Sequence, residues 1–120
     1  MTEPARSVDP AALDRLLEMT GGDPEFLDEL IQTYLDDAVV QLEGMRAAAG
    51  TDSPEELIRP AHSLKGNSAN VGAARLEELC RQLEADARAG SVERATERVA
   101  AAGAEFERVR AELAALRAQT

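Results

Sequence analysis

One short segment of this 120-residue chain combines a nucleophile, a cation and a glycine. His62 is the only histidine, and Lys65, three residues later, is the only lysine among 13 basic residues. A neutral imidazole is a nucleophile near pH 7, because its unperturbed pKa is about 6.5. It can take a phosphoryl group from an aspartyl phosphate, and a nearby ammonium can hold the phosphoryl oxygens. The segment therefore points to phosphoryl transfer, which depends mainly on positioning and charge stabilisation.

The helical pattern of the same segment places His62 away from the core. At about 100° per residue, five positions form one stripe that must face the core. They are Leu57, Ala61, Leu64, Ser68 and Val71. His62 lies about 140° from the centre of this stripe on the same geometry. It is thus expected to be exposed, which weighs against the common alternative of a hydrogen-bonded histidine in the core.

Gly66 lies one turn after His62, where a glycine costs about 1 kcal/mol relative to alanine in a helix interior. The missing side chain would leave room beside the imidazole for a bulky substituent or a partner's loop. A glycine here could also simply end the helix, and Lys65 could be an ordinary surface lysine. Between Arg59 and Arg81, however, four basic and two acidic residues give this acidic chain a locally basic zone around His62.

Five amphipathic helices are expected to position this segment. A capping side chain stands directly before proline at Asp9, Asp23 and Ser53, which is a strong signal for a helix start. The expected helices span residues 10–20, 24–48, 54–69, 72–89 and 91–118. Apolar residues of the last one alternate at spacings of three and four, as in a coiled coil or one helix of a bundle. The short turns favour the bundle, with a tail at 1–7 and a single domain at 8–120.

Composition excludes several classes of function. The net charge of −10 argues against a nucleic-acid or anionic-membrane surface. One cysteine, Cys80, excludes an internal disulfide, and no apolar run approaches the ~18 residues of a membrane helix. No zinc-ligand spacing, glycine-rich phosphate loop or kinase signature occurs. We therefore expect a cytoplasmic monomer that is not an enzyme and does not phosphorylate itself.

The sequence His62-Ser63-Leu64-Lys65-Gly66, with Gly72 ten residues after the histidine, resembles the signature of histidine phosphotransfer (HPt) domains. Two flanking segments, 21–27 (GGDPEFL) and 72–76 (GAARL), also resemble that family. The resemblance extends from Val8 to about Leu116. It implies an all-α fold, an up-down-up-down four-helix bundle with a short N-terminal lid helix.

The resemblance also implies a role for each residue of the motif. His62 would be phosphorylated on Nε2, Lys65 would help to hold the phosphoryl group, and Gly66 would give it room. A glutamine on the neighbouring helix often approaches the histidine in this family. Gln82 is the candidate here, although an ordinary solvent-facing glutamine would explain it equally well.

The function implied is that of a phosphocarrier between receiver-domain aspartates in a two-component phosphorelay. Its partners would be response-regulator receiver domains and a hybrid histidine kinase, and it would need no cofactor, because the assisting Mg²⁺ belongs to the receiver. We expect docking on the exposed surface around His62. The predicted docking residues are Ile58, Arg59, Ser63, Ala69 and Arg75. Two alternatives remain: a phosphate-independent scaffold for a receiver or kinase, and a structural bundle or coiled-coil dimer.

Overall fold

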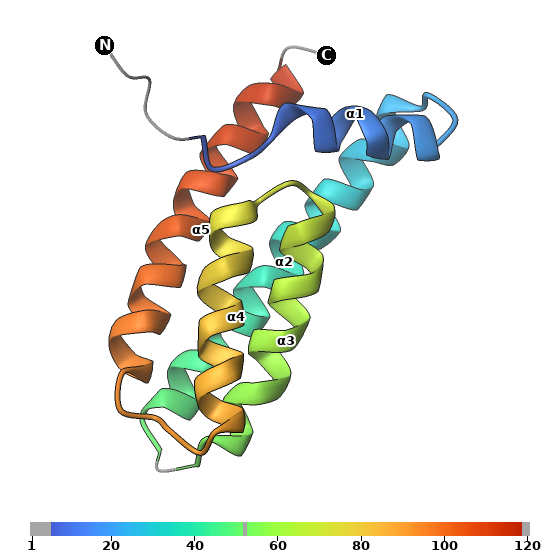
Figure 1. The fold of residues 1–120 in the computed structure, drawn as a ribbon. Helices are drawn as coiled ribbons and strands as arrows, with labels where there is room; N and C mark the ends of the chain where they lie inside the picture. The colour runs from blue at the N-terminus through green and yellow to red at the C-terminus, as the bar shows by residue number, and fades with distance from the viewer. Residues whose placement is uncertain (1–5, 52, 119–120) are drawn as a thin grey trace.

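The computed structural model of the chain describes residues 6–51 and 53–118 and is all-α over those residues. Its helices are α1 (Pro10–Met19), α2 (Pro24–Ala49), α3 (Glu55–Asn70), α4 (Ala74–Arg88) and α5 (Ala95–Ala118). The last four stand side by side as a bundle, and α1 lies across one end of it (Figure 1). This is the predicted four-helix bundle with a lid helix.

The four long helices form a ring in chain order. The pairs in contact are α2 with α3, α3 with α4, α4 with α5, and α5 with α2. Short turns make each helix run opposite to the one before it (Figure 1). Helix α3, which holds the candidate nucleophile, is therefore flanked by α2 on one side and α4 on the other.

Two of the predicted caps start their helices as expected. The Asp9 carboxylate accepts a hydrogen bond from the Ala11 amide, and the Asp23 carboxylate accepts from the Glu25 amide, both at 3.0 Å. Ser53 does not cap, because α3 begins at Glu55 and has no side-chain cap. Helix α5 begins four residues after the predicted position 91, because Ser91 accepts from the Glu93 amide and forms a turn first.

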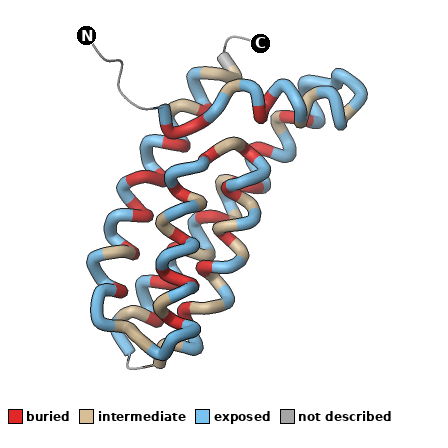
Figure 2. Tube along the Cα trace, viewed as in Figure 1, coloured by how far each residue is buried: buried red, intermediate tan, exposed pale blue. Residues whose placement is uncertain are grey.

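The core lies inside the ring of four helices, and the buried positions line its inner side (Figure 2). The predicted stripe of α3 is buried along its whole length. Phe106 of α5 meets Tyr34 of α2 edge to face, with 6.4 Å between ring centroids. Cys80 is fully buried, and so is the apolar seam of α5 from Val99 to Leu113. Since that seam packs within its own bundle, it is not free to pair as a coiled coil.

The lid helix is joined to the bundle at two points. The amides of Ser7 and Val8 donate to the Glu112 carboxylate of α5, each within 3.0 Å. The Asp9 amide donates to the carbonyl of Gly72, in the turn between α3 and α4, at 3.0 Å. Ser7, which falls in the segment 1–7 predicted as a tail, is therefore packed against the bundle, and residues 1–5 of that segment lie outside the described part. None of the described helices has the length and apolar character that a membrane crossing requires.

Candidate functional site

His62 lies on the outer surface of α3, as the helical pattern predicts. Its side chain is 61% exposed, whereas Ala61 and Leu64 beside it are fully buried. An exposed imidazole is accessible to a partner protein. The structure therefore confirms the position of the candidate nucleophile and excludes a histidine buried in the core.

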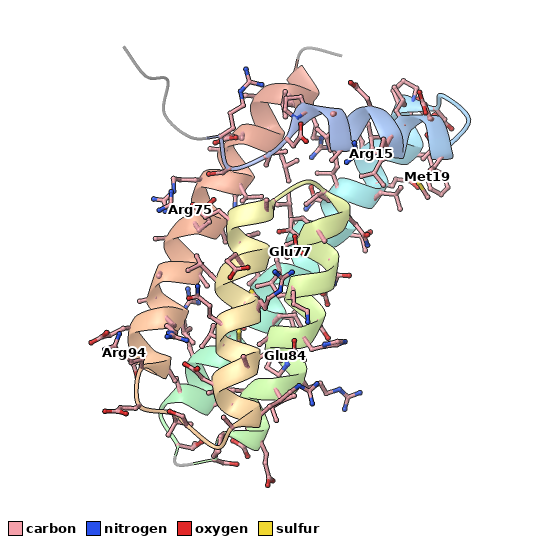
Figure 3. The ribbon with its side chains drawn as sticks, in the orientation of Figure 1. Arg15, Met19, Arg75, Glu77, Glu84 and Arg94 are labelled. Carbon is pink, nitrogen blue, oxygen red and sulfur yellow. The ribbon has the colours of Figure 1, made fainter. Side chains whose placement is uncertain are left out.

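A single carboxylate of α4 organises the site. The Oε2 atom of Glu84 lies 2.9 Å from Nδ1 of His62, and its Oε1 atom accepts a hydrogen bond of 2.6 Å from the Lys65 ammonium. The Arg88 guanidinium donates to Oε2 at 2.7 Å. The Glu84 side chain is only 7% exposed. Three polar groups from two helices therefore meet on one buried anion, the Glu84 carboxylate labelled in Figure 3.

This arrangement keeps Glu84 ionised. Burial raises the pKa of its carboxyl group, but the hydrogen bonds from Lys65, Arg88 and His62 outweigh burial and lower the pKa from 4.5 to about 2. An ionised carboxylate only accepts hydrogen bonds. The Nδ1 atom of His62 must therefore be the donor in this contact, and the neutral ring keeps its lone pair on Nε2. The nitrogen that faces away from Glu84 is thus the one whose lone pair is available for a reaction.

The structure does not bring Gln82 to His62. Gln82 and Glu84 are two residues apart on α4, so their side chains point about 200° apart around the helix axis. Glu84 faces α3, whereas Gln82 is exposed and its backbone carbonyl accepts a hydrogen bond from Arg98 of α5. Arg75 also lies on the α5 side of α4 (Figure 3). Glu84, and not Gln82, is the α4 residue bonded to the histidine.

Glu84 is not among the site residues predicted from the sequence, although the sequence contains a signal for it. Four charged residues of alternating sign follow one flank of α4 at spacings of four, three and four. They are Glu77, Arg81, Glu84 and Arg88. Arg81 binds both Glu77 and Glu78 at 3.0 Å or less, which leaves Glu84 for Arg88 and the groups of α3. A charged flank of this kind is usually solvated, and only the packing of α4 against α3 turns it into part of a site.

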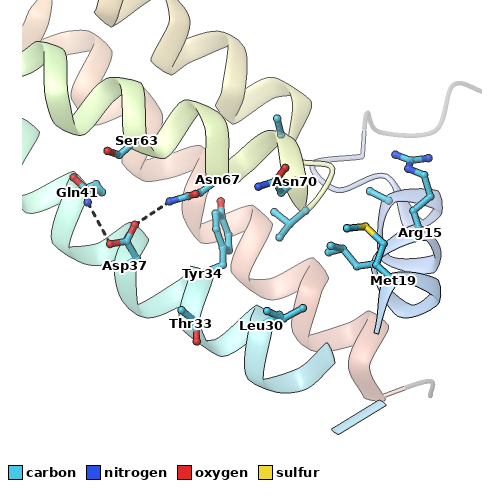
Figure 4. Close-up of a pocket in the computed structure, with 14 residues that line it drawn as sticks. Arg15, Met19, Leu30, Thr33, Tyr34, Asp37, Gln41, Ser63, Asn67 and Asn70 are labelled. Atoms are coloured by element: carbon cyan, nitrogen blue, oxygen red, sulfur yellow. Dashed lines mark hydrogen bonds between the residues drawn. The ribbon is translucent and has the colours of Figure 1, made fainter. Parts of the chain in front are cut away.

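A groove lies on the other side of α3, between α1, α2 and α3. It encloses about 880 Å³. Its apolar lining includes Leu16, Met19 and Leu30, and Met19 is 81% exposed. Its polar edge is fixed by Asp37 of α2, which accepts hydrogen bonds from Asn67 at 3.0 Å and from Gln41 at 3.2 Å (Figure 4). An exposed groove with an apolar lining is a suitable surface for a protein partner.

Comparison with known proteins assigns this arrangement to a family. The Hpt domain family matches residues 29–119, which include all of α3, α4 and the His62 motif. The chain belongs to the Hpt domain family. The crystal structure of histidine-containing phosphotransfer protein B (HptB) from Pseudomonas aeruginosa PAO1 superposes with a TM-score of 0.88. The two chains are 30% identical, and the comparison covers 98% of this chain and 99% of HptB.

Two plant proteins are also similar to this Hpt domain. The maize phosphotransfer protein ZmHP2 has the same fold, with a TM-score of 0.78 and 24% identity over 92% of this chain and 86% of ZmHP2. Histidine-containing phosphotransfer protein 2 of Arabidopsis thaliana is 34% identical over 62 residues, or 49% of this chain. The matched region spans 40% of the length of that curated relative.

The predicted docking residues of the Hpt domain lie in three places. Ser63 and Ala69 line the groove on the α2 side of α3. Arg59 is exposed and Ile58 half-buried on the outer surface of α3, close in sequence to His62. Arg75 lies apart from them, on the α5 side of α4 (Figure 3). The structure thus places two of the five predicted residues in the groove, two on the outer surface of α3, and Arg75 on α4 away from both.

Gly66 lies in the interior of α3, because the helix continues to Asn70 and does not end at the glycine. A Cβ atom at this position would meet nothing within 4 Å. Gly66→Gln is therefore expected to stabilise the Hpt domain by about 0.5 kcal/mol, since glutamine is the better helix former. The same side chain would occupy the space one turn from His62 and slow phosphoryl transfer.

Urea denaturation and transfer kinetics would measure these two effects separately. Ala104→Gln, on the outer face of α5, is a suitable control because Ala104 is exposed and far around the helix from the core. The control should leave transfer unchanged. If Gly66→Gln also left transfer unchanged, the open space beside His62 would have no part in the reaction.

Proposed function

We propose that this Hpt domain carries a phosphoryl group on His62 between the aspartates of receiver domains. The observation that supports this most directly is the contact between Nδ1 of His62 and the buried Glu84 carboxylate, at 2.9 Å. It leaves Nε2 with its lone pair on a ring that is 61% exposed. Family membership agrees with this role, and HptB is itself described as a histidine-containing phosphotransfer protein.

The transfer step needs little chemistry from this chain. The Nε2 lone pair attacks the phosphorus of an aspartyl phosphate, the bond from phosphorus to the aspartate oxygen breaks, and the carboxylate leaves. The reverse step returns the group to a second aspartate. Positioning and charge neutralisation supply most of the catalysis in such transfers. We propose that the receiver domain provides the Mg²⁺ and that this chain holds no cofactor of its own.

Lys65 is the cation of α3 that this proposal assigns to the phosphoryl oxygens. Its ammonium shares the Glu84 carboxylate with His62, so both groups stand at the same point of the α3–α4 surface. Lys65→Ala is expected to slow transfer about tenfold, which corresponds to about 1.4 kcal/mol of transition-state stabilisation. The helical circular dichroism should not change, because no core residue is altered.

Rapid-quench kinetics with a phosphorylated receiver would measure this effect. Arg94→Ala removes a positive charge from an exposed residue ahead of α5 and serves as the control for net charge (Figure 3). Equal rates for Lys65→Ala and Arg94→Ala would remove Lys65 from the site.

The receiver is proposed to dock over His62 and the groove between α1, α2 and α3. Ala69 is exposed, lies two turns after His62 and lines that groove. Ala69→Glu should therefore weaken receiver binding at least about tenfold, or about 1.4 kcal/mol, because a charged side chain would be buried in the interface. Ala104→Glu makes the same change on the outer face of α5 and should bind like the unaltered chain. Isothermal titration calorimetry would compare them, and equal affinities would place the docking surface elsewhere.

The proposed function is tested by a transfer experiment with isolated proteins. A receiver labelled with radioactive phosphate on its aspartate is mixed with the chain in the absence of ATP. We expect the label to move to the chain and to be lost in acid but kept in alkali, as a phosphoramidate linkage requires. A label that stays on every receiver tested, or an acid-stable label on the chain, would contradict the proposal.

A further inference from the structure

The segment that leads into α1 is fixed by one carboxylate of α5. The Glu112 Oε1 atom accepts hydrogen bonds from the Ser7 and Val8 amides, each at 2.9 Å, and its Oε2 atom accepts from the Ser7 amide at 3.0 Å. Ser7 is 4% exposed and Val8 is 1% exposed, whereas Glu112 is half-buried. The lid is therefore joined to the last helix of the bundle through a charged group.

The lid helix forms one wall of the groove. Four of its residues line the groove, namely Ala12, Arg15, Leu16 and Met19. The other groove residues come from α2, α3 and Val71. In Figure 1, α1 begins beside α5 and extends across the end of the bundle toward α2. A change at Glu112 would therefore act on the groove through the position of α1.

The lid is a short helix that depends on its attachments. It has 10 residues, of which Ala12 and Leu13 are buried. A helix of this length is marginal in water without tertiary contacts. Just ahead of it, the Asp9 amide donates to the Gly72 carbonyl at 3.0 Å. The docked position of α1 is thus set largely in the segment from Ser7 to Asp9, where Glu112 acts.

Loss of the Glu112 carboxylate would leave the Ser7 and Val8 amides without their acceptor. A buried amide that has no partner costs the full penalty of its desolvation, which exceeds the net value of the bond. The segment would then favour positions in which water binds both amides. The Val8 side chain, which belongs to the core, would leave with it. The lid would thus lose its position at the end that leads into α1.

We propose that Glu112 is a positioning residue for receiver docking. It holds α1 in the place where the lid completes the groove, and the receiver binds this docked form. This inference rests on the proposed function, in which the receiver covers the groove. A receiver that binds only one position of the lid shifts the chain toward that position. The coupling is reciprocal, so receiver binding should also protect α1 from exchange with solvent.

Glu112→Ala is expected to release the lid. The backbone amides of α1 should exchange with deuterium about tenfold faster, because hydrogen bonds to a charged acceptor are among the stronger ones. Glu112→Gln should give an intermediate rate, since its side-chain oxygen accepts hydrogen bonds but its NH₂ group cannot. Glu107→Ala is the control, because it removes an exposed carboxylate of the same helix that is bonded to Arg110 at 3.3 Å. Mass spectrometry of fragments that cover α1 would measure the exchange.

Transfer kinetics should show the same change as weaker receiver binding. The concentration of phosphorylated receiver that gives half of the maximal transfer rate should rise at least about fivefold in Glu112→Ala, the lower end of usual couplings between sites. The maximal rate should change far less, because His62, Lys65 and Glu84 are unaltered. Gly90→Ala is the control for general destabilisation, since it strains the turn between α4 and α5 at a φ of +83°. This control and Glu107→Ala should need no more receiver than the unaltered chain.

The two measurements together can overturn the inference. Equal exchange of α1 in Glu112→Ala and Glu107→Ala would mean that the Glu112 carboxylate does not hold the lid. Faster exchange with an unchanged requirement for receiver would mean that docking does not need the lid in place. Slower exchange of α1 in the unaltered chain at saturating receiver supports the inference, and unchanged exchange contradicts it. If the unaltered chain bound no receiver at all, the proposed function itself would fail.

Discussion

Replacing His62 by glutamine is expected to abolish labelling of the chain by a phosphorylated receiver and to leave the fold intact. The loss should be complete, because glutamine has no nucleophilic nitrogen and the chain has no second histidine. The fold should survive, because the His62 side chain is 61% exposed and contributes nothing to the core. Autoradiography after mixing with labelled receiver measures the first effect, and circular dichroism with urea denaturation measures the second.

This variant also separates the carrier from the scaffold alternative. A scaffold would bind its receiver through the same face and would never be labelled, so His62→Gln would change nothing in its behaviour. A carrier loses its label and keeps its binding, which calorimetry would detect. Labelling that persists in His62→Gln would place the phosphoryl group on another residue and contradict the assignment of the site.

Gly72→Ala is expected to have the largest effect on stability. Gly72 has a φ of +77°, a left-handed conformation that costs a non-glycine residue about 1–2 kcal/mol. An added Cβ atom would also stand 2.6 Å from the Ala12 Cβ and 3.0 Å from the Asp9 carbonyl oxygen, so the lid would have to shift. Overpacking of this kind costs about 1–3 kcal/mol more. The expected loss is therefore about 2–5 kcal/mol, a large part of a small domain's total stability.

Gly90→Ala provides a matched control for this prediction. Gly90 has a similar φ of +83°, but a Cβ atom there would meet nothing within 4 Å. The free energy of unfolding of Gly90→Ala should fall only by the cost of the left-handed backbone conformation, about 1–2 kcal/mol. Urea denaturation of both variants isolates the contribution of the contact between the lid and the turn. Equal losses for the two variants would mean that α1 does not pack against Gly72 in solution.

Much of the fold could be predicted because its signals are local. Asp9 and Asp23 mark helix starts through their own side chains, and the buried stripe of α3 follows from a period of 3.6 residues. The start of α5 was less predictable, because a serine such as Ser91 can either cap a helix or stabilise a turn. Here it accepts a hydrogen bond from the Glu93 amide and stabilises a turn. The contact of Gly72 with the lid joins residues 60 positions apart, and no local pattern reveals it.

The site was predicted in part for the same reason. His62 and its neighbours Lys65 and Gly66 share one helix, so periodicity places them. Glu84 comes from another helix, and the sequence cannot show which flank of α4 faces α3. The flank that faces α3 depends on how α4 is rotated about its own axis when the four helices pack. This rotation determines whether Glu84 or Gln82 lies beside His62.

Nε2 of His62 is proposed to hold the phosphoryl group, and nuclear magnetic resonance can test this directly. The chain is labelled with nitrogen-15 at its only histidine and phosphorylated by a receiver. We expect a phosphorus–nitrogen coupling to Nε2. A coupling to Nδ1, or phosphate on the chain without any coupling to the ring, would contradict it.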